Sequence, residues 1–394
     1  MKLLWLCHFI PYPLDFGGAI RAFQLIKAAA KANEVHLACL CWQRTPPEVP
    51  KALKEICTSV NIFRKDFSGK KKPQLLALLN GQSSLKLMNR SKELDSWLHE
   101  HAGEFDAVVM DHTQMAWANV PKNVPRIIAL HNIESELLKR TVKNDQNFIR
   151  RTYRRLDAEK LERAELAALK LAKTIIITSE REKELLQGLG LKMPIEVINN
   201  GADTKKFAAA ASNTKLAWPK KDIIFIGAGH YYPNEEAILW FYNNVWGKLH
   251  EIYPDLNWHI IGGKPGKNVL CLVDKNVKVL TNVPNILPHF QSARLLSVPL
   301  LSGSGTRIKI LEGAAAGVPI VTTSLGVEGL PFKNKEHCLI ADDPASFQAA
   351  CLDVLEDQNS AGEMALRARE LVAKNYDWDI IGNELLRFFE HCIK

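Results

Sequence analysis

Short apolar runs alternate along the chain with longer segments in which apolar residues recur every three or four positions. The spacing of three or four predicts amphipathic helices, whereas the short runs predict strands. Because the short runs are continuously apolar, we expect both faces of each strand to be covered by other parts of the protein. The predicted strands are residues 3–9, 35–41, 107–111, 127–130, 174–178, 195–198, 222–227, 258–261, 277–280, 295–299 and 319–323.

The alternation of strand and helix predicts the α/β class, with parallel sheets that carry helices on both faces. Residues 202–221 are polar and rich in alanine without a clear period, so they predict a linker between two doubly wound, Rossmann-like domains. We place the first domain at residues 1–203 and the second at residues 204–376. The final helix, predicted at residues 377–394, is expected to cross back to the first domain. The length of 394 residues agrees with two large domains.

The composition is that of a globular protein, because 47% of the residues are hydrophobic and 24% are charged. This excludes a disordered or fibrous chain. No apolar run approaches the roughly 18 residues that a membrane span needs. Residues 3–10 resemble the apolar part of a signal peptide, but no small-residue cleavage site follows, so a first buried strand is the better interpretation. The eight cysteines lack the spacing of a disulfide framework or a zinc site, which predicts reduced thiols and a cytoplasmic location.

The net charge of +8 is concentrated in one part of the chain. Residues 138–173 hold eleven lysines and arginines and five acidic residues on one predicted helical segment. This excess predicts an anionic partner, such as the acidic lipid headgroups at the inner face of a membrane. The alternative is a solvated helix in which Glu159 and Glu162 form ion pairs with neighbouring cations. The arginines at 150–155 would also suit nucleic acid, but no nucleic-acid-binding signature accompanies them, so we expect no such partner.

Two glycine-containing segments follow predicted strands, at the sheet edge where doubly wound folds bind ligands. Gly17 and Gly18 open a predicted helix, and their exposed amides suit a phosphate or a carboxylate. A tight strand-to-helix turn explains this pair equally well. The second segment, residues 299–306, is a glycine-rich loop that leads into a helix predicted to start near Thr306.

The second segment carries the stronger chemical signal. Arg307 and Lys309 lie at the start of the predicted helix, beside the amides of Gly305 and Thr306, and two cations beside free amides form a diphosphate site. Glu312 lies about one and a half turns further on and can reach a pair of hydroxyl groups beyond the phosphates. The alternative is a solvated helix with incidental charges, which explains the bracketing glycines poorly.

Two other phosphate-binding patterns fit less well. No Gly-x-x-x-x-Gly-Lys-Ser/Thr sequence occurs, so the loop is not a Walker loop. Gly227 and Gly229 imitate a dinucleotide-binding fingerprint, but Tyr232 stands in place of its third glycine. Nicotinamide binding is therefore a weak interpretation.

Five segments, taken in order, resemble the retaining, nucleotide-sugar-dependent glycosyltransferases of the GT-B fold. This family holds sucrose synthase and many bacterial surface-polysaccharide glycosyltransferases. The start of the chain, with Pro11-Tyr12-Pro13 and Ile20-Arg21, is similar to the branch linked to exopolysaccharide biosynthesis. The five segments are residues 17–18, 130–134, 197–203, 225–234 and 303–329.

The resemblance implies two Rossmann-like domains that face a cleft, and sugar transfer from a nucleotide-sugar donor to a glycan or lipid-linked acceptor. It implies that His131 contacts the transferred sugar or the acceptor, although a helix-capping role before Asn132 is the alternative. It also implies that the loop beginning at Val283 holds the base of the donor. Asp111 and His112 also end a predicted strand, and we interpret them as strand-end capping residues. The residues expected to bind the donor are Gly17, Gly18, Val283, Gly305, Thr306, Arg307, Lys309 and Glu312.

The chain departs from the family's pattern at two points. Ser304 stands where the family often has a glutamate eight positions before Glu312, and the loop at 228–234 lacks the usual cations. The cationic role therefore falls to Arg307 and Lys309, which we expect to act as catalytic residues by stabilising the departing diphosphate. A non-catalytic nucleotide-sugar-binding subunit of a polysaccharide assembly complex is the alternative, and an epimerase or phosphorylase of this fold is a third possibility.

We expect neither a resident cofactor nor a metal. The nucleotide sugar is a substrate, and the departing nucleoside diphosphate can itself take the proton of the acceptor. No Asp-x-Asp sequence flanked by acids and no spaced histidine pair indicates a metal site.

Overall fold

A computed structural model of the protein describes residues 1–43, 45–67, 69, 71–144, 148–211, 222–229 and 231–392. The chain divides into two compact units. The first unit comprises Met1–Leu14, Gly18–Asn199 and Gly382–Lys394, and the second comprises Asp15–Gly17 and Asn200–Ile381. Half of the predicted linker, residues 212–221, lies outside the described residues, and so does His230.

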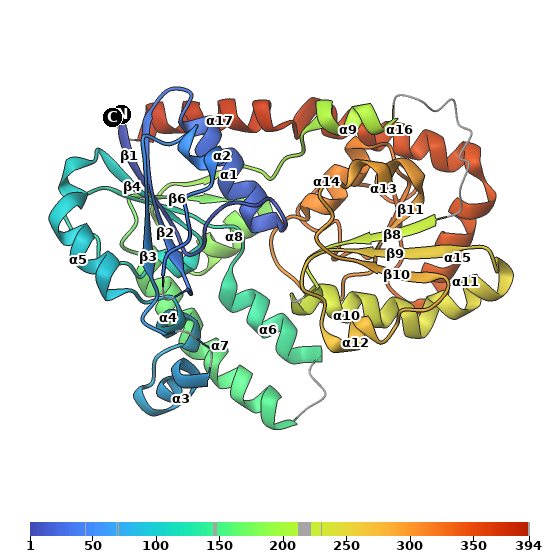
Figure 1. Cartoon of the computed structure of the whole chain (residues 1–394), viewed down its shortest axis with the longest axis horizontal. Helices are drawn as coiled ribbons and strands as arrows, with labels where there is room; N and C mark the ends of the chain where they lie inside the picture. Colours follow the sequence, from blue (N-terminus) through green and yellow to red (C-terminus); the bar gives the residue numbers. More distant parts are fainter. Residues whose placement is uncertain are drawn as a thin grey trace. The chain divides into compact units, whose positions relative to one another are not determined.

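The first unit contains a seven-stranded sheet in the order β3-β2-β1-β4-β5-β6-β7, in which every pair of neighbours is parallel. This sheet and the helices around it confirm the predicted α/β class for the first half of the chain (Figure 1). Its strands are β1 (Lys2–Cys7), β2 (Glu34–Cys41), β3 (Ser59–Arg64), β4 (Ala107–Asp111), β5 (Arg126–Ala129), β6 (Thr174–Ile177) and β7 (Ile195–Val197).

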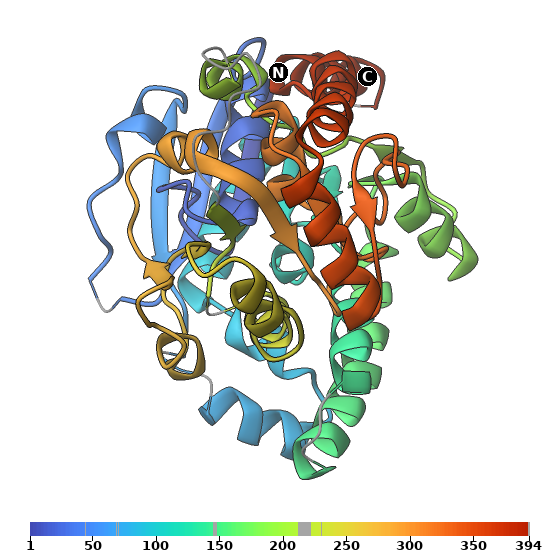
Figure 2. The ribbon, with the colours of Figure 1, turned by 90° about the vertical axis from the view of Figure 1, so that its right-hand side faces the viewer.

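The second unit contains a six-stranded parallel sheet in the order β10-β9-β8-β11-β12-β13. Helices lie on both sides of this sheet (Figure 2), as a doubly wound fold requires. Its strands are β8 (Asp222–Ile226), β9 (Asn257–Ile261), β10 (Val277–Leu280), β11 (Ala293–Val298), β12 (Ile320–Thr322) and β13 (Leu339–Ile340).

Every strand predicted from an apolar run is present, but two edge strands were missed. β3 lies at the edge of the first sheet, and Phe63 is its only buried residue. β13 has only two residues and lies at the edge of the second sheet. An edge strand needs less apolar surface than a central one, so a search for continuous apolar runs does not find it.

Helices connect the strands in both units. The segment at 138–173, predicted as one helix, corresponds instead to the end of α6 and to α7, with residues 145–147 between them outside the described part. In the described residues no helix has both the length and the apolar composition that crossing a bilayer requires. The helices of the first unit's sequence are α1 (Gly17–Ala29), α2 (Lys51–Lys54), α3 (Lys71–Asn80), α4 (Ser84–Met88), α5 (Lys92–His101), α6 (Glu134–Asn144), α7 (Phe148–Leu169) and α8 (Glu180–Gly188). Those that follow are α9 (Thr204–Ala211), α10 (Tyr232–Phe241), α11 (Gly247–Ile252), α12 (Lys267–Leu270), α13 (Leu287–Ser292), α14 (Ile308–Ala315), α15 (Pro344–Glu356), α16 (Gln358–Asn375) and α17 (Trp378–Cys392).

The final helix crosses between the units, as predicted. α17 begins within the second unit, and from Gly382 onward it belongs to the first. A side chain at Gly382 would lie 2.9 Å from Cβ of Ala28 on α1, so the helix packs closely against the first unit.

The described chain also contains all eight cysteines, and every one of them is a free thiol.

Apolar side chains cover both faces of the first sheet. Along β1, Leu4 and Leu6 belong to one large core, and Leu3 and Trp5 on the opposite face are equally buried. Burying one such leucine stabilises the fold by about 1.5–3 kcal/mol. The continuous apolar run of β1 therefore reflects burial on both faces of the sheet, as the sequence predicted.

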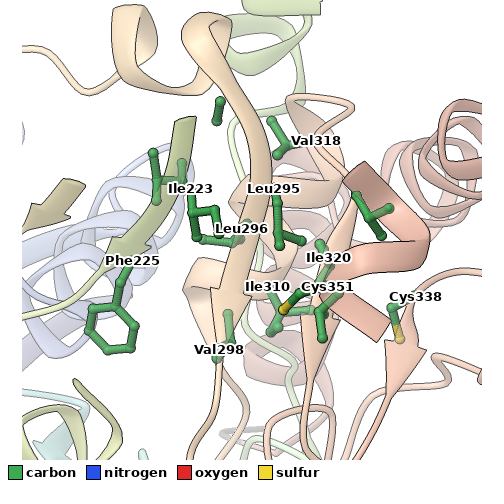
Figure 3. Close-up of a cluster of buried hydrophobic side chains, with 14 of the residues drawn as sticks. Ile223, Phe225, Leu295, Leu296, Val298, Ile310, Val318, Ile320, Cys338 and Cys351 are labelled. Carbon is green, nitrogen blue, oxygen red and sulfur yellow. The ribbon is translucent and has the colours of Figure 1, made fainter. Parts of the chain in front are cut away.

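The core of the second unit holds the start of α14 in place. Figure 3 shows Leu295, Leu296 and Val298 of β11 among the buried side chains, together with Ile310 of α14. A Cβ atom at Gly313 would lie 2.3 Å from Cδ2 of Leu296, so glycine permits α14 to lie directly on β11.

We expect Gly262→Ala to destabilise the second unit. A Cβ atom at Gly262, just after β9, would lie 1.9 Å from the carbonyl oxygen of Gly227, which follows β8. Such overpacking costs about 1–3 kcal/mol and would lower the melting temperature by several degrees in calorimetry. Gly263→Ala is the matched control, because nothing lies within 4 Å of the position that its Cβ atom would take. Equal melting temperatures for the two variants would contradict the close approach of the two strand ends.

Candidate functional site

The glycine-rich loop of the second unit runs from the end of β11 to the start of α14. Gly303 and Gly305 have φ values of 140° and 75°, in the region of backbone conformation that favours glycine. Asn200 ties down the end of the loop, because its side-chain amide donates to the carbonyl oxygen of Thr306 at 3.0 Å and to Oγ1 of the same residue at 2.7 Å. The end of the loop is therefore fixed by hydrogen bonds within the second unit.

Arg307 precedes the helix and does not belong to its first turn. α14 begins at Ile308, and Arg307 is its N-cap residue with extended backbone angles (φ −96°, ψ 102°). The predicted helix start near Thr306 was therefore two residues too early, because Arg307 has an extended backbone and the helix can begin only after it. The buried guanidinium of Arg307 lies close to Gly303, where a Cβ atom would be 3.1 Å from Nη2.

Lys309 lies in the first turn of α14 and faces the end of β8. Its Nζ donates to Oδ1 of Asn234 at 2.8 Å and lies 4.3 Å from the centre of the Phe225 ring. A Cβ atom at Gly227 would lie 2.7 Å from Nζ, so only glycine leaves room for the amine there. The pKa of Lys309 is lowered to about 7, mainly by burial and also by the charge of Arg307, whereas Glu312 opposes the change.

Glu312 is the third buried ionisable group of this cluster. Burial raises its pKa to about 7, and the positive charges of Lys206 and Lys309 oppose that rise. Val283 lies between β10 and α13, where it packs partly buried against the core of the second unit. The structure thus brings Gly305, Thr306, Arg307, Lys309 and Glu312 together at the start of α14.

The other predicted residues follow β1 and β5 in the sequence, and Gly17 among them belongs to the second unit. Gly17 and Gly18 are the first two residues of α1, as the sequence indicates. His131 follows β5 by two residues and is nearly buried. α6 begins at Glu134, three residues later, so His131 is not the capping residue of that helix.

His131 belongs to a cluster that also contains Asp111 and His112. Nε2 of His131 lies 2.9 Å from Oδ1 of Asp111, and Nδ1 of His112 lies 2.9 Å from Oδ2 of the same carboxylate. The two imidazole rings overlap, with centroids 3.4 Å apart. The strand register explains the meeting, because Asp111 at the end of β4 pairs with Ala129 at the end of β5.

The electrostatics of the cluster keep His131 neutral. Burial lowers its pKa to about 3, although the charge of Asp111 opposes the shift. Burial alone would raise the pKa of Asp111, but the adjacent His131 and His112 hold it well below its usual value. An ionised carboxylate can only accept a hydrogen bond. Nε2 of His131 therefore carries the proton and donates a hydrogen bond to Asp111. Nδ1 of His131 is then the acceptor of this imidazole.

The same three side chains form a potential metal-binding group. Their ligand atoms all lie within 4.8 Å of one another. The sequence analysis found no metal site here, because His131 lies some twenty positions beyond Asp111 and only the sheet brings them together. The two separations of 2.9 Å are hydrogen-bond distances, so each carboxylate oxygen already has an imidazole partner.

Two models of protein families match this chain. Residues 17–206 match the model described as Glycosyltransferase Family 4, and residues 220–357 match the model described as Glycosyl transferases group 1. A protein of Klebsiella pneumoniae described as an uncharacterized 44.6 kDa protein in the cps region is 20% identical over 385 residues, which cover 93% of this chain and 94% of that protein. The phosphatidyl-myo-inositol mannosyltransferase of Mycobacterium tuberculosis is 25% identical over 210 residues, which cover 49% of this chain and 53% of that protein.

Solved structures with low sequence identity share the fold of the whole chain. Sucrose-phosphate synthase from Thermosynechococcus elongatus has a TM-score of 0.74 and 16% identity. The matched region covers 99% of this chain and 98% of the synthase chain. Anabaena Alr3699/HepE, solved in complex with UDP-glucose, has a TM-score of 0.69 and 14% identity, and covers 99% of each chain.

We expect His131 to remain a neutral imidazole with its proton on Nε2 from pH 8 down to pH 5. The reason is the burial that lowers its pKa to about 3. Nitrogen-15 NMR of the histidine-labelled protein measures both the charge and the tautomer, and His131→Gln assigns the signal. A titration of this signal between pH 5 and pH 8, or a proton on Nδ1, would contradict the proposed hydrogen bond to Asp111.

Proposed function

Because the chain belongs to the glycosyltransferases of the GT-B fold, we propose that it transfers a sugar from a nucleotide-sugar donor with retention of the anomeric configuration. The observation that carries this proposal is the cluster of Arg307, Lys309 and Glu312 at the start of α14. Two cations beside the amides of a glycine-rich loop suit a diphosphate, and a carboxylate further along suits the hydroxyl groups of a ribose. The complex of Anabaena HepE with UDP-glucose supports a donor of this class.

The proposed acceptor is a glycan or a lipid-linked molecule of surface polysaccharide biosynthesis. The description of the Klebsiella pneumoniae relative places that protein in a cps region, which supports an acceptor of polysaccharide biosynthesis. The name of the mycobacterial relative, a phosphatidyl-myo-inositol mannosyltransferase, supports a lipid-linked acceptor. We further propose that residues 138–173 dock on an acidic membrane from the cytoplasmic side. Within this segment Lys139 pairs with Glu162 and Arg140 with Glu136, so part of its positive charge is neutralised inside the unit.

The proposed chemistry takes place on one face of the sugar. The bond between the anomeric carbon and the diphosphate oxygen breaks, and the acceptor hydroxyl forms its bond to the same face. The departing diphosphate takes the proton of that hydroxyl, so no covalent intermediate with a protein carboxylate is needed. Arg307 and Lys309, with the amides at Gly17 and Gly18, would stabilise the growing negative charge, and each such group is worth about 3 kcal/mol.

His131 would contact the transferred sugar as a neutral hydrogen-bonding group. Its proton on Nε2 is committed to Asp111, so Nδ1 is the atom that can accept from a sugar hydroxyl. This proposal needs no metal, because the two cations perform the role that a divalent ion performs at other diphosphate sites.

The decisive test is the anomeric configuration of the product. We expect the purified protein to hydrolyse a matching nucleotide sugar slowly in the absence of acceptor and to release the anomer that the donor carried. Proton NMR of the first-formed sugar, over a panel of nucleotide sugars, measures this outcome. The rate should be unchanged by a chelator, and Arg307→Ala should lower kcat/KM about a hundredfold.

The matched control for this test is Lys333→Ala, which removes an exposed cation of the second unit and should leave the rate unchanged. Release of the inverted anomer would overturn the retaining mechanism. Donor binding without any turnover would favour the alternative, a non-catalytic nucleotide-sugar-binding subunit.

The affinity for a nucleoside diphosphate should fall as the pH rises above 7. The pKa of Lys309 is about 7 in the ligand-free protein, and the diphosphate binds the protonated amine, so binding takes up a proton and weakens at higher pH. Glu312 ionises over the same range and adds to the decrease. Calorimetry from pH 6 to pH 9 should show a weaker pH dependence for Lys309→Arg, because arginine keeps its charge. An identical pH dependence in both proteins would exclude Lys309 from the diphosphate site.

A further inference from the structure

A second cationic cluster lies in the first unit, and it is made of residues other than those described above. The end of β3, residues 65–67 and the helices α3, α4 and α5 line an open cavity of about 670 Å³. Its charged lining residues are Arg64, Lys65, Asp66, Arg90, Lys92 and Glu93. Neither the resemblance nor the proposed function assigns a role to this cavity.

The cavity is positively charged, because four cations face two carboxylates. Both carboxylates accept from the backbone, since the amide of Lys92 donates to Asp66 at 2.9 Å and the amide of Arg64 donates to Glu93 at 3.2 Å. Arg90 makes only a long contact with Asp66, at 3.8 Å. The acidic residues therefore shape the wall and leave an excess of positive charge inside it.

Lys65 is the buried centre of this cluster, with only 3% of its surface exposed. Its Nζ donates to Oδ1 of Asn89 at 2.6 Å and lies 4.4 Å from the centre of the Trp42 ring. Both partners are uncharged, so neither neutralises the ammonium group. Burial lowers the pKa of Lys65 to about 7, because keeping a buried amine charged costs free energy. An anion beside Lys65 would remove much of that cost.

The cavity lies on the same edge of the sheet as the histidine cluster. All seven strands are parallel, so the residues that follow β3 lie at the same edge as those that follow β1, β4 and β5. Burial lowers the pKa of His8, the charges of His112 and Lys65 add to this shift, and the ring of His8 packs against His112 with centroids 4.7 Å apart. A ligand bound between the cavity and His131 would therefore follow one continuous edge.

The remaining walls of the cavity are partly apolar. Phe67, Leu76 and Leu87 line it, and α3, which contributes Leu76, exposes Leu75 and Leu79 on its surface. Figures 1 and 2 both show α3 beside the end of α7 at one extremity of the first unit. Arginine forks beside lysines favour the three oxygens of a phosphate over a single carboxylate, and the volume accommodates a phosphate with a sugar or with isoprenoid units.

We propose that this cavity binds a phosphate group of the acceptor, carried either by a soluble sugar phosphate or by a lipid phosphate. The proposal rests on the proposed function, because it assigns the ligand to the acceptor. Lys65, Arg64, Arg90 and Lys92 hold the phosphate, and the acceptor extends from it along the sheet edge toward His131.

The first experiment measures the binding of inorganic phosphate to the full chain by calorimetry. The wild-type protein should bind phosphate at one more site than the double variant Arg90→Gln/Lys92→Gln. Lys51→Gln/Lys54→Gln is the matched control, because it removes two exposed lysines of α2 from the same unit and should keep every site. Lys65→Met tests the buried centre, and circular dichroism shows whether it folds. Identical isotherms for the wild type and Arg90→Gln/Lys92→Gln would overturn the phosphate site.

The second experiment separates the two sources of phosphate. Glucose 6-phosphate is compared with neutral-lipid vesicles that contain a polyprenyl phosphate, and vesicles with the same fraction of phosphatidylglycerol control for charge alone. Tenfold or greater weakening by Arg90→Gln/Lys92→Gln for one of the two ligands identifies the source. Equal loss for phosphatidylglycerol vesicles would mean general attraction to acidic lipid and would overturn the specific site.

Different experimental results would overturn this proposal and the proposed function. If the protein transfers sugar equally well to an acceptor and to its dephosphorylated form, the acceptor role is overturned and the glycosyltransferase activity stands. If phosphate binds in the cavity but no donor is turned over, the proposed function fails and the acceptor assignment fails with it.

Discussion

The close packing of α14 on β11 is the constraint on which the second unit's candidate site depends. Gly313 has no side chain to separate the helix from Leu296, so the helix axis lies directly against the central strand. Arg307 immediately precedes this helix, and Lys309 and Glu312 lie on it, so their positions follow from that contact. Glycines at 227 and 303 then leave the space that the lysine and arginine side chains require.

Buried ionisable groups recur at each candidate site. Lys309 and Glu312 in the second unit, and Lys65 in the first, all have a pKa of about 7 because burial disfavours their charged forms. Such buried ionisable groups lower the stability of the folded protein, and they are typical of sites that bind charged ligands. A diphosphate beside Lys309 and a phosphate beside Lys65 would restore the charged amines, so ligand binding and protonation are coupled at both positions.

The sheet order of the first unit has a direct chemical consequence. Because β3, β2, β1, β4 and β5 are neighbours and parallel, their carboxyl ends form one edge. Lys65, His8, Asp111 and His131 lie along it in that order of strands. A neutral histidine with a defined tautomer and a cationic cavity therefore share one surface, which suits an acceptor with a hydroxyl group at one end and a negative charge at the other.

The sequence alone determined the features that depend on neighbouring residues. Continuous apolar runs identified the central strands, since burial on both faces demands them, and the glycine-rich loop before α14 identified the cluster of Arg307, Lys309 and Glu312. It did not identify β3, because a half-exposed edge strand lacks that signature. It also placed the start of α14 two residues early, because the extended backbone of Arg307 is not evident from the sequence.

Only the tertiary structure decided which distant residues meet. Asp111 and His131 form a hydrogen bond because β4 and β5 are adjacent, and no local pattern specifies that adjacency. The same holds for Lys65 and Asn89, which come from a strand end and a helix end. The pKa values of these groups are also tertiary properties, since they depend on how much water the surrounding chain excludes.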